Sequence, residues 1–243
     1  MKIFTSSNMA KYFAEMVVVV LGILIAFQVE EWRQQRIEQR DIDAALVRLA
    51  DEVQSNLRYC ESVEPYSRQL VQGAQLVLTS LQSGRLSEED RSRFEQGLVK
   101  INWLALPPYY STVAEEMIAT GLLKELDQAE LRANIARIPG SVAETKGRFS
   151  RQVEVADFAR LEIRNQVGFR YDGSIDESLA RKAASAADSS FVDAVSVIDY
   201  DFDTLAANRY LINQIIDATS NQIENFASNQ RLCQLFENVD SEL

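Results

Sequence analysis

Residues 9–32 read MAKYFAEMVVVVLGILIAFQVEEW, and they are the most apolar part of the chain. Residues 16–27 form an unbroken apolar run, with Tyr12 before it and Trp32 after it. At the rise of an α-helix, the span between these aromatic residues is about 30 Å, which matches the hydrocarbon core of a bilayer. Aromatic side chains at both ends are typical of a membrane interface. We therefore predict an N-terminal transmembrane helix, with residues 1–34 as the membrane anchor and its short tail.

The predicted anchor is expected to stay on the mature chain and to continue as a long helix. An apolar core of this size also fits a signal peptide, but no small-residue cleavage pattern follows it. From residue 30 to residue 60 the chain has neither Gly nor Pro, and apolar residues recur at spacings of three or four. Pro65 is expected to kink or end this helix.

Residues 35–243 are predicted to form a soluble antiparallel helical bundle, so that the fold class is all-α. The last helix, at about 203–236, is long enough to pack antiparallel along the first. The stripes expected to meet are Leu46, Leu49, Val53 and Leu57 on one helix, and Ile212, Ile216, Ile223 and Phe226 on the other.

The middle of the chain is predicted to contain shorter helices and two non-helical stretches. Pro139 and Gly140 are expected to separate a helix at 128–138 from a longer one at 141–170. A weaker helix is predicted at 174–187. Residues 102–110 contain two prolines and are expected to be extended, and the partial alternation in 191–203 indicates the one candidate strand.

Composition excludes several classes of function. The net charge of -11, with no concentrated basic face, argues against a nucleic-acid partner. The chain has no histidine, so it lacks the commonest general base and metal ligand. We find no catalytic motif, and we predict no catalytic residues, no cofactor and no metal site. Cys60 and Cys233 are compatible with one disulfide or with two buried thiols.

Two blocks of sequence resemble an uncharacterised family of bacterial single-pass membrane proteins catalogued as a domain of unknown function. The first is KYFAEMVVVVLGILIAFQVEEW and the second is YYSTVAEEMIATGLLKELDQAELRANI. The first departs from the family at Glu30 and Glu31, where other polar residues are usual. The resemblance implies a helical domain exported across the membrane, and it implies no activity.

Polar and small residues make the predicted anchor a candidate for interaction with a partner helix. Glu15 either bonds to a polar group of such a helix or lies at the headgroup edge, and Gln28 either bonds across the helix pair or marks the interface beside Trp32. Gly22 and Ala26 form a weak small-xxx-small face for close helix packing. These five residues are the predicted membrane-helix interaction site.

Tyr109, Tyr110, Glu116 and Gly121 are the candidate interaction residues of the soluble domain. Aromatic and acidic groups beside a diprolyl loop suit a small polar or cationic ligand. The alternative is that the loop is pinned against the bundle and that the polar groups only cap a helix.

The sequence therefore predicts a non-enzymatic single-pass membrane protein that is an accessory or scaffold subunit of a membrane complex. Its expected partners are the lipid bilayer and either another membrane protein or further copies of itself. The alternative is an extracytoplasmic sensory or ligand-binding helical domain. The expected location is the bacterial inner membrane with the soluble domain in the periplasm, although the charges flanking the anchor do not decide the orientation.

Overall fold

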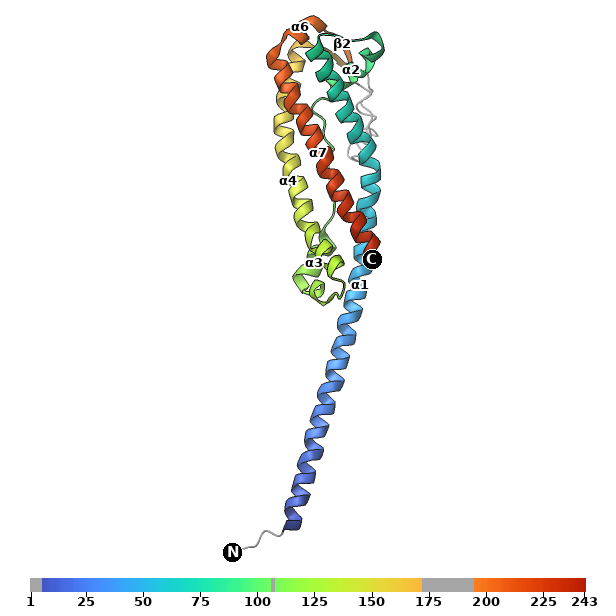
Figure 1. Cartoon of the computed structure of the whole chain (residues 1–243), viewed down its shortest axis with the longest axis vertical. Helices are drawn as coiled ribbons and strands as arrows, with labels where there is room; N and C mark the ends of the chain where they lie inside the picture. Colours follow the sequence, from blue (N-terminus) through green and yellow to red (C-terminus); the bar gives the residue numbers. More distant parts are fainter. Residues whose placement is uncertain (1–5, 106–107, 172–194) are drawn as a thin grey trace.

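The computed structural model describes residues 6–105, 108–171 and 195–243. Helix α1 (Ser6–Ser83) is 78 residues long, which corresponds to about 117 Å at helical rise. Its first half projects from the rest of the molecule, and its second half packs into a bundle (Figure 1). The predicted continuous helix is therefore confirmed.

Helix α1 runs through Pro65, so of the two expected outcomes, a kink or the end of the helix, the end is wrong. Proline removes one backbone hydrogen bond and crowds the carbonyl four residues earlier, here that of Glu61. Pro65 and Glu61 are both exposed, so water can solvate the freed carbonyl. Val63 and Ser67 on either side are buried, and their packing holds the helix together across the proline.

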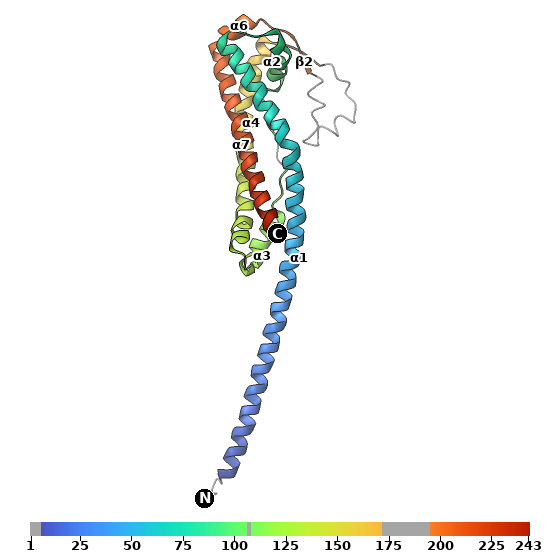
Figure 2. The same ribbon diagram turned by 45° about the vertical axis from the view of Figure 1, so that its right-hand side comes forward.

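The bundle is mostly helical, which confirms the all-α prediction at the level of fold class. The other helices are α2 (Glu88–Lys100), α3 (Thr112–Thr120), the 3-10 helix η1 (Leu122–Glu125), α4 (Ala129–Gln166), α6 (Phe202–Ala207) and α7 (Arg209–Glu242). Helices α1, α4 and α7 run alongside one another, with α2 and α6 at one end and α3 near the point where α1 leaves the bundle (Figures 1 and 2).

Helix α4 is continuous through Pro139 and Gly140, so the prediction of two separate helices is wrong. Ile138 and Val142 are both buried in the same hydrophobic core. The loss of one hydrogen bond at Pro139 is therefore outweighed by packing on both sides of it.

Two short strands form an antiparallel pair at the end of the bundle away from the projecting half of α1 (Figure 1). Strand β2 (Val195–Asp199) lies within the predicted strand, which is thereby confirmed over these residues. Its partner β1 (Gly168–Tyr171) begins inside the stretch predicted to be the helix 141–170. The helix predicted at 174–187 lies outside the described residues.

Helix α7 packs antiparallel against α1, and the α1 side of the contact is the predicted stripe, but most of the residues that α7 buries are not the expected ones. Leu49 and Val53 of α1 are buried, whereas Ile223 of α7 is exposed and Phe226 only half-buried. The apolar residues that α7 buries are Leu211, Ile215, Ala218, Leu232, Leu235, Phe236 and Val239. These side chains fall in two clusters, which we call the first core, containing Leu49 and Phe236, and the second core, containing Val77 and Ile215.

A disulfide between Cys60 and Cys233 ties α1 to α7 across 173 residues of chain, which settles the pairing that the sequence left open.

Over the part of the chain that the structure describes, none of the helices combines the length and the apolar character needed to cross a membrane.

Candidate functional site

The projecting section of α1, defined here as residues 13–41, exposes large apolar side chains on every side. Phe27 is 70% exposed, and no described side chain of this section is buried. Burial begins only at Ile42, where α1 enters the first core. The exposed apolar residues are Phe13, Met16, Val17, Val18, Val19, Val20, Leu21, Ile23, Leu24, Ile25, Phe27, Val29, Trp32 and Ile37.

The five residues predicted to mediate helix interaction, Glu15, Gly22, Ala26, Gln28 and Trp32, all lie in this section and are exposed. A Cβ atom added at Gly22 would have nothing within 4 Å, so this face of the helix is open to a second helix. The guanidinium of Arg36 lies 4.0 Å from the centre of the Trp32 ring, a cation–π contact. The structure thus leaves all five residues accessible, with Glu15, Gly22 and Ala26 on one face of the helix and Gln28 on another.

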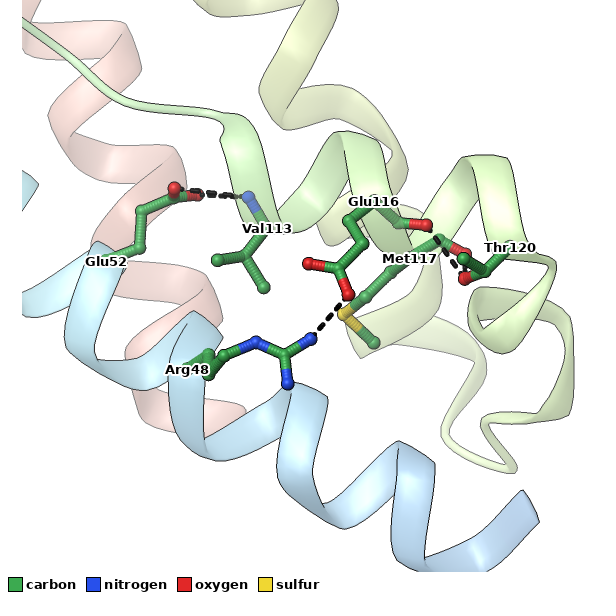
Figure 3. Close-up of polar contacts among 6 residues, drawn as sticks. All are labelled: Arg48, Glu52, Val113, Glu116, Met117 and Thr120. Carbon is green, nitrogen blue, oxygen red and sulfur yellow. Dashed lines mark hydrogen bonds and ion pairs between the residues drawn. The ribbon is translucent and has the colours of Figure 1, made fainter. Parts of the chain in front are cut away.

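A polar corner joins α1 to α3 where the bundle begins (Figure 3). Arg48 of α1 forms an ion pair with Glu116 of α3, with 2.6 Å between Nη2 and Oε1. One helical turn later, the carboxylate of Glu52 accepts a hydrogen bond from the backbone N–H of Val113 at 3.2 Å. Burial raises the pKa of the Glu52 carboxyl, and hydrogen bonds from the backbone of residues 112–114, at the N-terminus of α3, oppose this shift. Glu52 therefore caps α3 from another helix.

Residues 101–105 and 108–110 lie outside the helices and strands, and side-chain amides hydrogen-bond to their backbone. Asn56 of α1 accepts from the N–H of Tyr110 and donates to its carbonyl, both at 2.9 Å. On α7, the amide of Gln222 donates to the carbonyls of residues 100, 101 and 103, and Asn225 bonds to both backbone groups of Ala105. These amides satisfy buried backbone groups that no helix or strand pairs.

Tyr109 lies at the centre of the first core, beside the disulfide. Its ring makes an edge contact with Tyr59 and a tilted contact with Phe236. Its hydroxyl donates to the side-chain carbonyl of Asn229 and lies 3.5 Å from the sulfur of Cys233. Burial, and then the neighbouring Tyr59, raises the pKa of Tyr109. The hydroxyl therefore stays neutral, and Tyr109 acts as a packing residue of the first core.

The four candidate residues of the soluble domain have separate local roles. Tyr109 is buried, whereas Tyr110 is exposed and presents its backbone to Asn56. Glu116 is paired with Arg48, and Gly121 ends α3 with a left-handed φ of 84°. These placements agree with the alternative in which the loop is pinned against the bundle.

The polar contacts of Tyr110 and Glu116 could not be predicted from the sequence, because their partners lie far away in the chain. Arg48 and Glu116 are 68 residues apart, and Asn56 and Tyr110 are 54 apart. A weak signal was present, since Arg48, Glu52 and Asn56 recur every four residues on one face of α1.

Comparisons with models of protein families, with curated proteins and with solved structures found no match. The resemblance of two sequence blocks to a bacterial membrane-protein family therefore stays a prediction.

Proposed function

We propose that this chain is a non-enzymatic single-pass membrane protein whose bundle is an accessory or scaffold subunit of a membrane complex. The observation that carries the proposal is the exposure of the apolar side chains around the whole projecting section. Exposed apolar surfaces of this extent mark sites that a membrane or another protein covers. A bilayer covers all faces of a helix, whereas a docking groove covers one.

The polar residues of the projecting section fit a membrane anchor with its ends at the two interfaces. Trp32, with Arg36 stacked on it, suits the boundary between lipid and water. Glu15 and Gln28 then lie toward opposite edges of the hydrocarbon, where a polar group costs less than at the centre. Residues 16–27 between them are entirely apolar.

The disulfide supports a position of the bundle outside the cytoplasm. Structural disulfides persist in oxidising compartments such as the bacterial periplasm. Cys60 and Cys233 lie in the bundle, so the bundle and not the N-terminal tail belongs on the oxidising side. We propose the inner membrane with a periplasmic bundle.

A partner helix is proposed to pack on the face that carries Gly22 and Ala26. The open space beside Gly22 permits close approach, and Glu15, which lies on the same face, can bond to a polar group of that helix, whereas Gln28 faces the other side. The partner is either another membrane protein or a second copy of this chain.

Charge substitution in the projecting section tests the proposal. Leu21→Lys places a cation at the middle of the apolar run and should cost about 2.5 to 3.5 kcal/mol of insertion free energy. The full chain should resist extraction by alkaline carbonate and float with lipid vesicles, and Leu21→Lys should do so far less.

The matched control is Val47→Lys, which changes an exposed residue of the same helix within the bundle. This variant should stay with the membrane as the unmodified chain does. Release of the unmodified chain by carbonate, with recovery as a soluble protein without detergent, would overturn the membrane proposal. Retention of the chain without any copurifying protein and as a monomer would overturn the subunit proposal alone.

A further inference from the structure

A narrow groove lies between α1 and α2, at the end of the bundle away from the projecting section (Figure 1). The two helices touch there through Gly73 and Gly97, since a Cβ atom added at Gly73 would lie 3.5 Å from Cα of Gly97. The groove has a volume of about 90 Å³, against about 300 to 1,000 Å³ for typical small-molecule sites. It therefore has room for one small chemical group and not for a whole drug-sized ligand.

Lys100 lines this groove with a charge that nothing in the described part of the molecule neutralises. The residue is only 8% exposed, yet its side chain makes no ion pair and no hydrogen bond with any described residue. The polar atoms that are both enclosed and unpartnered do not include Nζ of Lys100, so the ammonium group is accessible from outside. Burying a cation without an acceptor is unfavourable, and an anion bound beside it would remove that cost.

The distribution of acidic residues selects this groove over a neighbouring hollow. Lys100 also borders a hollow beside β2, which is lined by the carboxylate of Glu95. Among the described residues, no acidic side chain lines the groove between α1 and α2, although the chain has a net charge of -11. An anion is therefore favoured in the groove between the helices and repelled from the hollow beside β2.

The other polar groups of the groove are hydrogen-bond donors that suit an oxyanion. Arg93 is exposed and contacts Asp90 through Nη1 at 3.4 Å, and its remaining N–H groups have no partner in the described part of the chain. Three side-chain amides also line the groove, those of Gln69, Gln72 and Gln96. Two cations with several N–H donors match the charge and the three terminal oxygens of a phosphate group better than the single charge of a carboxylate.

We propose that the groove between α1 and α2 binds inorganic phosphate or the terminal phosphate group of a small soluble molecule. Lys100 contacts the phosphate from inside the groove and Arg93 contacts it from the rim, with the glutamine amides donating further hydrogen bonds. The phosphodiester of a lipid headgroup is the other source of this chemistry, and the position of the groove disfavours it. Gly73 lies about 60 Å beyond Trp32 along α1 at helical rise, far from the proposed membrane interface.

Calorimetric titration of the full, oxidised chain with inorganic phosphate, in a mild detergent that contains no phosphate, tests this site. Saturable binding is expected, tighter than that of acetate and tighter than that of dimethyl phosphate, which represents the lipid phosphodiester. Lys100→Met should weaken phosphate binding about 10- to 100-fold, because it removes a buried charged donor. Arg93→Gln should weaken it about threefold, because this residue is exposed.

The matched control is Lys146→Met, the same substitution at an exposed lysine of α4 that does not line the groove. This variant should change phosphate affinity less than twofold. Equal losses in Lys100→Met and Lys146→Met would show that only the net charge matters and would overturn the site. Dimethyl phosphate binding as tightly as inorganic phosphate would overturn the assignment to a terminal phosphate.

Thermal unfolding separates binding by Lys100 from a purely structural role. Phosphate should raise the melting temperature of the unmodified chain and leave that of Lys100→Met unchanged, because only a chain that binds the ion is stabilised by it. A lower melting temperature of Lys100→Met, with no effect of phosphate on either protein, would assign the lysine to the C-terminal dipole of α2 and overturn the site. If Lys100→Met does not fold, unchanged affinity in Arg93→Gln, or no binding by the unmodified chain up to about 10 mM phosphate, would overturn it instead.

Discussion

The two sections of α1 belong to one unbroken helix, yet their apolar residues follow different rules. In residues 13–41 large apolar side chains are exposed all around the helix, whereas in residues 42–83 they are buried along one stripe, as at Leu49 and Val77. Periodicity is informative only where one face meets a core and the other meets water. The two sections are therefore suited to different surroundings, although their backbone is continuous.

The largest effect is expected from the link that fixes the packed section to α7. Removing it in Cys60→Ser combined with Cys233→Ser frees a loop of 173 residues in the unfolded chain. In the chain-entropy model this lowers the free energy of unfolding by about 5 kcal/mol. Denaturant titration of the full chain in mild detergent measures the loss.

Reductant should lower the free energy of unfolding of the unmodified chain to a similar degree and should leave that of the cysteine-free variant unchanged. An unchanged denaturation midpoint in that variant would mean that packing alone fixes α1 against α7.

The contrast between the two sections is tested directly by truncating one leucine in each. Leu49→Ala removes a side chain that is fully buried in the first core, and should lower the free energy of unfolding by about 2 to 5 kcal/mol. Leu24→Ala changes a residue that is 53% exposed in the projecting section, and should alter bundle stability by about 0.5 kcal/mol or less. Equal effects at both positions, measured by the same titration, would abolish the distinction.

A smaller effect is expected at the closest approach of the packed section to α2. A Cβ atom at Gly97 would lie 2.7 Å from the carbonyl oxygen of Gly73 and 2.7 Å from Cγ2 of Val77. Gly97→Ala should therefore lower the free energy of unfolding by about 1 to 3 kcal/mol, because α2 must move away from α1. Gly22→Ala in the projecting section meets no atom within 4 Å and should leave the bundle unaffected. A stable Gly97→Ala variant would show that the two helices separate without cost.

Helices and their packing could be predicted from the sequence where the buried residues are apolar and recur at regular spacing. The continuity of α1 from the projecting section into the bundle, the antiparallel position of α7 and the strand at 195–199 are predicted by spacing, whereas the extension of α1 past Pro65 is not. The contact face of α7 was not, because polar residues such as Gln222, Asn225 and Asn229 occupy part of it. Polar residues on a helix normally indicate a solvated face, and here they bond to backbone groups of residues 100–105 and to the hydroxyl of Tyr109. The prediction therefore selected the wrong face of the helix.

The remaining errors have local causes. Pro65 and Pro139 both lie inside helices, since packing on each side outweighs one lost hydrogen bond. At the candidate site, Glu116 was singled out from the sequence, but its partner Arg48 belongs to another helix. Pairing across such distances depends on the tertiary fold, which no local pattern contains.

The position of the disulfide has a mechanical consequence for any force applied to the projecting section. A pull along the axis of α1 loads the noncovalent contacts of residues 42–59 first, because the bond at Cys60 lies beyond them. At helical rise this stretch is about 27 Å long. Once residues 42–59 have separated from the bundle, the disulfide transmits the force to α7. The part of α1 beyond Cys60 therefore stays attached to the bundle under this load.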